Sequence, residues 1–250
     1  MTDFRVLPEA EPLYAVGNRI GVVVSHGFAG SPHTVRFWGE GIARAGYTVA
    51  MPRLKGHGTA PADLAAATAS DWTADIVAAV RWLEERCDVV FVTGISMGGT
   101  LTLWAAGQFP DRFAGIVTVN AAIKLDAPDF AALAFAPDAP AEIPGTGSDI
   151  KAEGVQRMGY PVTPVPAIKH LLALCGVTDH MLPRVKCPAL IMQSREDHIV
   201  PPRNAELILN AISSEEKELL WLEDSYHVAT LDNDKELVLE KTLEFIRKHT

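Results

Sequence analysis

Short apolar runs rich in β-branched residues alternate with stretches of helical spacing along most of this sequence, and this alternation restricts the fold more than any other feature. Runs that are apolar throughout are typical of strands buried on both faces, which occur in parallel sheets covered by helices. The sequence therefore predicts an α/β fold with a mostly parallel central sheet flanked by helices, and ligand sites at the carboxyl ends of the strands. The expected strands are residues 21–25, 47–51, 89–92, 115–119, 189–192 and 218–222, and the clearest helices are 71–86, 101–109, 204–212 and 235–248.

The composition narrows the class of protein and of partner. Of the 250 residues, 48% are hydrophobic and 21% are charged, which is typical of a globular chain and excludes a disordered one. Twenty-two Lys and Arg against 31 Asp and Glu give a net charge of −9, which argues against nucleic acid or an anionic membrane as an electrostatic partner. Cys87, Cys175 and Cys187 form neither a disulfide framework nor a metal-ligand pattern, so we expect reduced, intracellular thiols.

Neither the first residues nor the longest uncharged stretch predicts a membrane segment. The N-terminus contains no apolar run, so we expect no signal peptide. Residues 89–110 are uncharged and long enough to span a bilayer, but Gly, Ser and Thr interrupt them. A strand, a tight turn and a buried helix explain this stretch better, and we expect a cytoplasmic protein.

Residues 123–183 break the alternation of strands and helices. This 61-residue stretch holds 8 of the 17 prolines and is too long for a plain loop. It follows the carboxyl end of strand 115–119, where a ligand site is expected. We therefore predict a core of residues 1–122 and 184–250 with a small inserted cap of residues 123–183, the alternative being a peripheral decoration far from any site.

The motif Gly94-Ile95-Ser96-Met97-Gly98 predicts a catalytic serine. It matches G-x-S-x-G and lies between strand 89–92 and the helix that follows, as a nucleophile elbow requires. The glycines allow a sharp turn that exposes the hydroxyl of Ser96, and the helix N-terminus favours a developing negative charge. The motif alone is weak, but this strand–turn–helix context favours a nucleophile.

A second loop is placed to hold an oxyanion. His26-Gly27-Phe28-Ala29-Gly30 follows strand 21–25 directly. In hydrolases with a nucleophile elbow, one backbone N–H of the corresponding loop and the N–H of the residue after the nucleophile together bind the oxyanion. The expected donors are Phe28 and Met97, whereas His26 is interpreted as a structural residue that orients the loop.

A serine nucleophile needs a base and an acid, in the chain order serine, acid, histidine. Of the eight histidines, His227 fits this order and lies between the last strand and the last helix. Glu196 and Asp197 both follow strand 189–192, and their spacing alone does not decide between them. Asp224 is a competitor near His227 that is better interpreted as a turn or cap residue.

Together these features resemble the α/β-hydrolase superfamily over nearly the whole chain, and more closely the small bacterial carboxylesterases and monoacylglycerol lipases. The resemblance implies that Asp197 is the acid, that a small cap covers the site, and that carboxylic esters are hydrolysed without a cofactor. The motifs that carry it are His26-Gly27-Phe28-Ala29-Gly30-Ser31-Pro32, Gly56-His57-Gly58, Glu196-Asp197-His198-Ile199-Val200-Pro201-Pro202 and Ser225-Tyr226-His227-Val228-Ala229-Thr230-Leu231-Asp232.

One departure concerns glycerol recognition. The resemblance to the monoacylglycerol lipases implies an acidic cap residue that contacts the glycerol hydroxyls. Pro161, in Tyr160-Pro161-Val162-Thr163-Pro164, aligns with that position here. This departure favours a broader carboxylesterase.

The predicted function is a serine ester hydrolase that cleaves monoacylglycerols or simple fatty-acyl esters through an acyl-enzyme, with Ser96, Asp197 and His227 as triad. Thioesterase, perhydrolase, carbon–carbon hydrolase and aminopeptidase chemistry share this triad and stay open, and a catalytically silent ligand receptor is the alternative from another class. Apolar surface on the cap suits transient membrane contact or a second subunit, so a monomer and a homodimer both stay open. Six cap residues either line an acyl tunnel or bury the cap's own core: Phe130, Leu133, Phe135, Leu171, Leu172 and Leu174.

Two smaller patterns concern helix starts and metal sites. Ser70 or Asp71 is the expected N-cap of helix 71–86. Asp232-Asn233-Asp234 looks like the start of a calcium loop but lacks its Gly and closing Glu, so it is interpreted as the cap of the last helix. No P-loop or H-E-x-x-H pattern occurs, and we expect neither a metal nor a cofactor.

Overall fold

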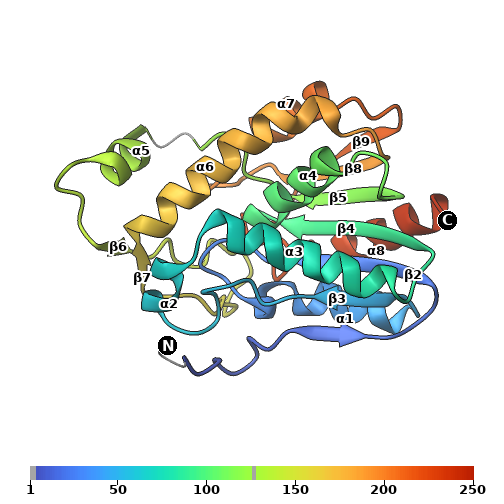
Figure 1. The fold of residues 1–250 in the computed structure, drawn as a ribbon, viewed down its shortest axis with the longest axis horizontal. Coiled ribbons are helices and arrows are strands. Elements are labelled where there is room, and N and C mark those ends of the chain that lie inside the picture. The colour runs from blue at the N-terminus through green and yellow to red at the C-terminus, as the bar shows by residue number, and fades with distance from the viewer. Residues whose placement is uncertain (1–3, 126–127) are drawn as a thin grey trace.

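The computed structural model describes residues 4–125 and 128–250 and contains a seven-stranded sheet, which lies at its centre (Figure 1). The strand order is β1-β3-β2-β4-β5-β8-β9, and within it only β1 runs antiparallel to its neighbour. The mostly parallel sheet predicted from the apolar runs is therefore present. The strands are β1 Leu13–Ala15, β2 Ile20–Ser25, β3 Thr48–Met51, β4 Val89–Ile95, β5 Gly115–Val119, β8 Ala189–Ser194 and β9 Lys217–Leu222.

Helices cover both faces of the sheet and bury two separate cores. One core lies beneath α3, α4, α6 and α7, and Ile76, Leu101 and Ile208 belong to it. The other lies beneath α1 and α8 and includes Trp38 and Phe245. The helices are α1 Arg36–Arg44, α2 Pro61–Ala66, α3 Ala69–Glu84, α4 Met97–Gln108, α5 Pro128–Phe135, α6 Val165–Met181, α7 Arg203–Ala211 and α8 Lys235–Lys248, with 3-10 turns at Pro32–Val35 and Leu182–Arg184.

Several element boundaries differ from the sequence predictions because tertiary contacts extend or shorten the local pattern. Strand β4 continues to Ile95, three residues past its apolar run, since β2 and β5 pair with it along its length. Helix α4 begins at Met97 rather than at Leu101, because the turn at Ser96 leads directly into it. The uncharged stretch of residues 89–110 is thus a strand, a turn and a helix, as predicted.

The N-cap of α3 differs from the prediction of Ser70 or Asp71, whereas the N-cap of α8 lies within the predicted stretch of residues 232–234. The N-cap of α3 is Thr68, whose hydroxyl accepts from the N–H of Asp71 while the Asp71 carboxylate accepts from the N–H of Thr68. At α8 the N-cap residue is Asp234, but its side chain makes no cap hydrogen bond. Instead, buried Asp232 accepts from the N–H groups of Lys151, Ala152 and Tyr226, so it joins the inserted segment to the loop before α8.

The described part of residues 123–183, which we call the inserted segment after the sequence prediction, contains two kinds of structure. Short strands β6 Glu142–Pro144 and β7 Val162–Pro164 form a two-stranded antiparallel sheet, and α5 packs near them around a small core of Ala134, Val165 and Ile168. Helix α6 contributes to both this small core and the main core: its first turns supply Val165 and Ile168 to the small one. It then runs along α4, as Figure 1 shows, and its residues Leu171, Leu174 and Cys175 join the main core. Within residues 4–125 and 128–250, no helix is long and apolar enough to cross a membrane.

Candidate active site

Ser96 lies at a strained turn between β4 and α4. Its backbone has φ 56° and ψ −124°, a conformation that a non-glycine residue adopts only when its surroundings impose it. A Cβ at Gly94 would overlap the carbonyl of Gly98, and a Cβ at Gly98 would overlap the carbonyl of Ser25 in β2. The motif glycines are therefore required by close packing of the backbone, and the turn holds the Ser96 side chain at the carboxyl edge of the sheet.

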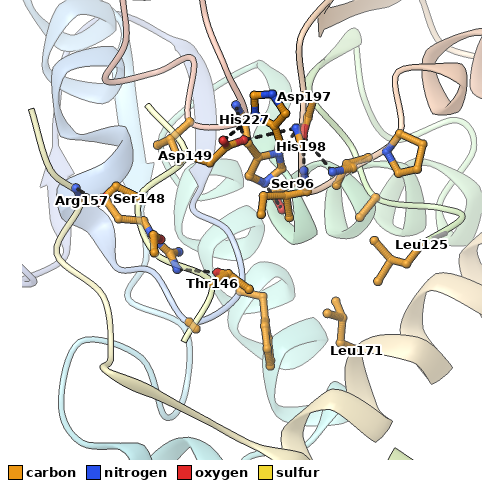
Figure 2. A pocket seen from close by; sticks show the side chains of 18 of the residues that line it. Ser96, Leu125, Thr146, Ser148, Asp149, Arg157, Leu171, Asp197, His198 and His227 are labelled. Atoms are coloured by element: carbon orange, nitrogen blue, oxygen red, sulfur yellow. Dashed lines mark hydrogen bonds and ion pairs between the residues drawn. The ribbon is translucent and has the colours of Figure 1, made fainter. Parts of the chain in front are cut away.

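The structure brings Ser96, His227 and Asp197 together (Figure 2). His227 Nε2 lies 2.9 Å from Ser96 Oγ, and His227 Nδ1 lies 2.8 Å from Asp197 Oδ2. Both contacts are satisfied when Nδ1 carries the proton and donates to the carboxylate, which leaves Nε2 to accept from the serine hydroxyl. The side chains of His227 and Asp197 are 9% and 0% exposed, so solvent scarcely screens this pair.

Asp197, rather than Glu196 or Asp224, contacts the histidine. The other oxygen of the Asp197 carboxylate accepts the N–H groups of Ile199 and Val200 at 2.9 and 2.8 Å, which fixes the acid in the turn after β8. Glu196 and Asp224 are exposed and lie 3.8 and 3.2 Å from Lys151 Nζ. The three carboxylates that the spacing left open therefore differ in their contacts, since Asp197 points to His227 and the other two point to Lys151.

The two expected oxyanion donors lie beside Ser96. Met97 is the first residue of α4, so its N–H has no acceptor within the helix, and the N–H of Phe28 finds none among the described residues. Phe28 and Ser96 both line one cavity, and a Cβ at Gly27 would lie 3.0 Å from the Cβ of Ser96. The loop before Phe28 therefore packs directly against the turn that carries Ser96.

Two buried histidines, His26 and His57, pack beneath and within the loop of residues 26–30. His26 accepts the N–H of Leu54 at Nε2, 3.1 Å away, and its Nδ1 lies 2.9 Å from the carbonyl of Gly27. His57 packs edge to face against His26, Phe28 and Trp72. Burial lowers the pKa of His26 well below its ordinary value and that of His57 to about 4, so both rings are neutral supports.

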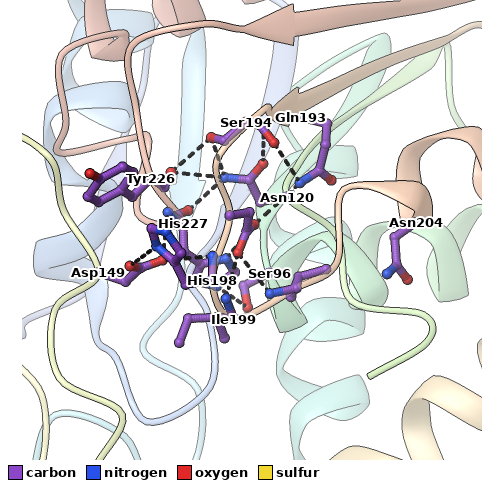
Figure 3. A network of polar contacts seen from close by, with 12 residues as sticks. Ser96, Asn120, Asp149, Gln193, Ser194, His198, Ile199, Asn204, Tyr226 and His227 are labelled. Atoms are coloured by element: carbon purple, nitrogen blue, oxygen red, sulfur yellow. Dashed lines mark hydrogen bonds and ion pairs between the residues drawn. The ribbon is translucent and has the colours of Figure 1, made fainter. Parts of the chain in front are cut away.

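Asp149 and Asn120, which the sequence did not single out, hydrogen-bond to the loops around Asp197 and His227 (Figure 3). The Asp149 carboxylate accepts the N–H of His227 at 3.1 Å and contacts His198 through its N–H at 3.3 Å and Nδ1 at 2.8 Å. Asn120 Nδ2 donates to the carbonyl of His227 at 2.7 Å, and its Oδ1 accepts the N–H of Ser194 at 2.7 Å. A positive φ at both residues was the structural sign of a special role, and the sequence carries no equivalent signal.

A cavity of about 510 Å3 opens above Ser96 and has two chemically distinct sides (Figure 2). Leu125, Phe130 and Leu171 contribute apolar surface, and Leu125 and Leu171 lie together in the view. Thr146, Ser148 and Arg157, from the inserted segment, line the other side. The cavity can therefore hold a ligand with an apolar part and a polar part on either side of the serine.

Only some of the proposed tunnel residues face this cavity. Phe130 and Leu171 line it, whereas Leu174 belongs to the main core and Leu172 packs against the small core of the insert. Leu133 is partly buried, and Phe135 is 64% exposed. The six residues thus differ in position: two line the cavity, one packs on the small core of the insert, one joins the main core, and Leu133 and Phe135 are partly or largely exposed.

Neither Pro161 nor a metal cluster contributes to the cavity. Pro161 is exposed and does not line it, although nearby Thr163 does. Among the described residues, no group of three or more His, Cys, Asp or Glu side chains could hold a metal ion. The chemistry available at Ser96 is that of a serine, a histidine, a carboxylate and backbone N–H donors.

This chain matches one protein family over most of its length and is similar to two characterised bacterial enzymes. Residues 34–250 match the prolyl oligopeptidase family (Peptidase_S9). The thermostable monoacylglycerol lipase of Bacillus sp. (strain H-257) is 47% identical over 248 residues, which cover 99% of this chain and 98% of that protein. A carboxylesterase of Bacillus subtilis (strain 168) is 27% identical over 242 residues, or 95% of this chain and 96% of the relative.

A solved structure extends the similarity to three dimensions. It comes from work on LipS and LipT, two metagenome-derived lipolytic enzymes, and is 74% identical to this chain. The match covers 98% of this chain and 100% of the other, with a TM-score of 0.97. The fold predicted from the sequence, a mostly parallel sheet of the α/β-hydrolase kind, is confirmed by this match.

Proposed function

Since this chain belongs to the prolyl oligopeptidase family of α/β-hydrolases and is a serine ester hydrolase, we propose that Ser96 is its nucleophile, His227 its general base and Asp197 its acid. The observation that carries this proposal is the unbroken hydrogen-bonded chain from Ser96 Oγ through both ring nitrogens of His227 to Asp197. A serine hydroxyl is a weak nucleophile without an adjacent base, and His227 lies in position to be that base when its Nδ1 carries the proton.

The reaction proceeds through an acyl-enzyme. His227 Nε2 takes the proton of Ser96 as Oγ attacks the ester carbonyl, and Asp197 stabilises the resulting imidazolium. The N–H groups of Phe28 and Met97 hold the oxyanion, and each such donor lowers the barrier by about 3 kcal/mol. His227 then protonates the departing alcohol, activates water and returns to its starting state as the acid product leaves.

We propose a monoacylglycerol or a simple fatty-acyl ester as the substrate. The apolar surface of Leu125, Phe130 and Leu171 suits an acyl chain, and the polar side of the cavity suits the alcohol. The exposed position of Pro161 leaves glycerol recognition to other residues, which favours a broader carboxylesterase. Both substrate classes agree with the activities of the similar proteins, a monoacylglycerol lipase and a carboxylesterase.

We also propose a cap over the site, a surface for contact with lipid or a second subunit, and a cellular setting. Residues 123–183 act as a cap over a core of residues 1–122 and 184–250. Phe135 on α5 and Val177 on α6, 64% and 53% exposed, suit transient contact with lipid or with a second subunit. Three buried free cysteines, Cys87, Cys175 and Cys187, suit a reducing, cytoplasmic setting.

Replacement of the serine tests the proposal directly. Ser96→Ala is expected to lower kcat for p-nitrophenyl octanoate by roughly three to six orders of magnitude, because the covalent step is lost. The variant should also resist a serine-reactive fluorophosphonate probe while its thermal unfolding stays cooperative. Ser70→Ala, an exposed serine on α3, is the matched control and should keep full activity. Retained hydrolysis by Ser96→Ala would contradict the assignment.

A chain-length series then defines the substrate. Monoacylglycerols and p-nitrophenyl esters with acyl chains of two to eighteen carbons are compared by kcat/KM. A higher value for monoacylglycerols at every length supports glycerol recognition despite Pro161. A preference for short activated esters supports a general carboxylesterase, and failure to hydrolyse either series would overturn the ester proposal.

A further inference from the structure

Arg157 places a guanidinium on the polar side of the cavity (Figure 2). Its Nε donates to the carbonyl of Gly147 at 2.5 Å, and its Nη2 donates to Thr146 Oγ1 at 2.9 Å. Both acceptors are neutral oxygens from the same turn of the inserted segment. The Nη1 donors have no acceptor among the described residues, so part of the guanidinium stays available to a ligand.

No carboxylate among the described residues forms an ion pair with Arg157. Two carboxylates line the cavity, but each is occupied elsewhere. Asp149 accepts from His198 and from the backbone of His227, while Asp197 is bonded to the ring of His227. The cavity therefore contains a cation whose charge no described acid neutralises.

An unneutralised guanidinium in a partly buried wall carries a cost. Desolvation lowers the pKa of Arg157 below its ordinary value, although a guanidinium remains protonated at neutral pH. The protein as a whole has a net charge of −9, so a positive charge facing the cavity is opposite in sign to the charge of the whole chain. A bound anion would offset the desolvation cost, and a guanidinium is well suited to bind carboxylate or phosphate through two parallel hydrogen bonds.

We propose that Arg157 binds an anionic group, a carboxylate or a phosphate, on the alcohol part of the ester substrate. This inference rests on the proposed function, since it takes Ser96 as the point of attack. The acyl chain lies against Leu125 and Leu171, and the alcohol lies on the opposite side, against Thr146 and Arg157. Hydrolysis then releases a fatty acid and an anionic alcohol from this side of the cavity.

Three esters with the same acyl chain test the proposal. Octanoylglycerol, octanoylglycerate and octanoylglycerol 3-phosphate differ only in whether the alcohol is neutral, a carboxylate or a phosphate. The wild-type protein is expected to hydrolyse at least one anionic ester with a kcat/KM about tenfold to a hundredfold above that of octanoylglycerol, as expected for a charge-assisted hydrogen bond. The better of the two anions identifies which group the site takes.

Arg157→Met should abolish this ratio, and Arg157→Lys should restore part of it. A merely structural role, in which Arg157 only holds the turn at Thr146, would lower all three activities by the same factor. Arg44→Met removes an equal charge from an exposed position on α1 and should leave the ratio as in the wild type. An unchanged ratio in Arg157→Met would overturn the proposal, as would a wild-type preference for octanoylglycerol.

Hydrolysis of p-nitrophenyl octanoate separates this proposal from the proposed function. If the wild-type protein cleaves that ester and Ser96→Ala does not, the triad stands. A lack of preference among the three octanoyl esters then counts against Arg157 alone. If Ser96→Ala still cleaves p-nitrophenyl octanoate, the proposed function fails first.

Discussion

At the scale of single residues, the position of His227 depends on a side chain from the inserted segment. Asp149 is only 14% exposed, and its carboxylate accepts the backbone N–H of His227 while its own carbonyl accepts the N–H of Val228. It also binds His198, the residue after the proposed acid. One residue of the insert therefore ties together the two loops that carry the proposed acid and base.

Substitutions at Asp149 test this positioning role. Its φ of 41° lies in the left-handed region, which Asn tolerates better than Ala. Asp149→Asn keeps an amide oxygen as acceptor and should retain most activity, whereas Asp149→Ala should lower kcat about tenfold with little change in KM, since a displaced histidine slows chemistry more than binding. Steady-state kinetics on p-nitrophenyl octanoate measures the difference, and thermal unfolding detects general destabilisation. Equal losses in both variants would contradict the role.

At the scale of elements, the turn between β4 and α4 is held by backbone packing. Gly98 leaves no room for a Cβ because the carbonyls of Ser25 and His26 lie against it. Strand β2 and helix α4 can approach this closely only without a side chain at that position. The proposed nucleophile and the proposed oxyanion loop are thus held together by the same contact.

A pair of helical glycines tests how much this contact contributes. Gly98→Ala should lower the free energy of unfolding by about 3 kcal/mol, because the new methyl group forces β2 and α4 apart. Gly176 lies on the exposed side of α6, where a Cβ meets nothing within 4 Å, so Gly176→Ala should raise the free energy of unfolding by about 0.5–1 kcal/mol through helix propensity. Urea denaturation measures both. A neutral Gly98→Ala would show that the elbow tolerates a side chain.

Local features of the fold could be predicted from the sequence, whereas contacts between residues far apart in the chain could not. Helix α8 matches its predicted range of 235–248, because its apolar spacing is a local property. Ser96 and His227 could be named because chain order and element order are visible in the sequence. Asp149 and Asn120 could not, since their partner His227 is 78 and 107 residues away and only the fold brings them together. The division into core and cap stays a prediction.

At the scale of the whole molecule, buried neutral histidines link folding to pH. His57 is fully buried and its pKa is about 4, against about 6.5 when unfolded. Between these values the unfolded chain binds a proton at this ring and the folded protein does not. Stability from this group is therefore complete above pH 6.5 and falls as the pH drops towards 4. His26, whose pKa is also lowered, adds an effect of the same sign.

We expect the free energy of unfolding to fall by as much as about 3 kcal/mol on account of His57 alone between pH 6.5 and 4, as a shift of this size implies. Urea denaturation at several pH values across this window measures the loss. His57→Gln should be less stable than the wild type at pH 7, because its ring contacts with Phe28 and Trp72 are lost, but its stability should depend less on pH. His180→Gln, exposed at the end of α6, should keep the wild-type dependence. Parallel curves of the free energy of unfolding against pH for the wild type and His57→Gln would contradict the linkage. If the His57 ring takes up a proton on unfolding, its removal must reduce the dependence of stability on pH.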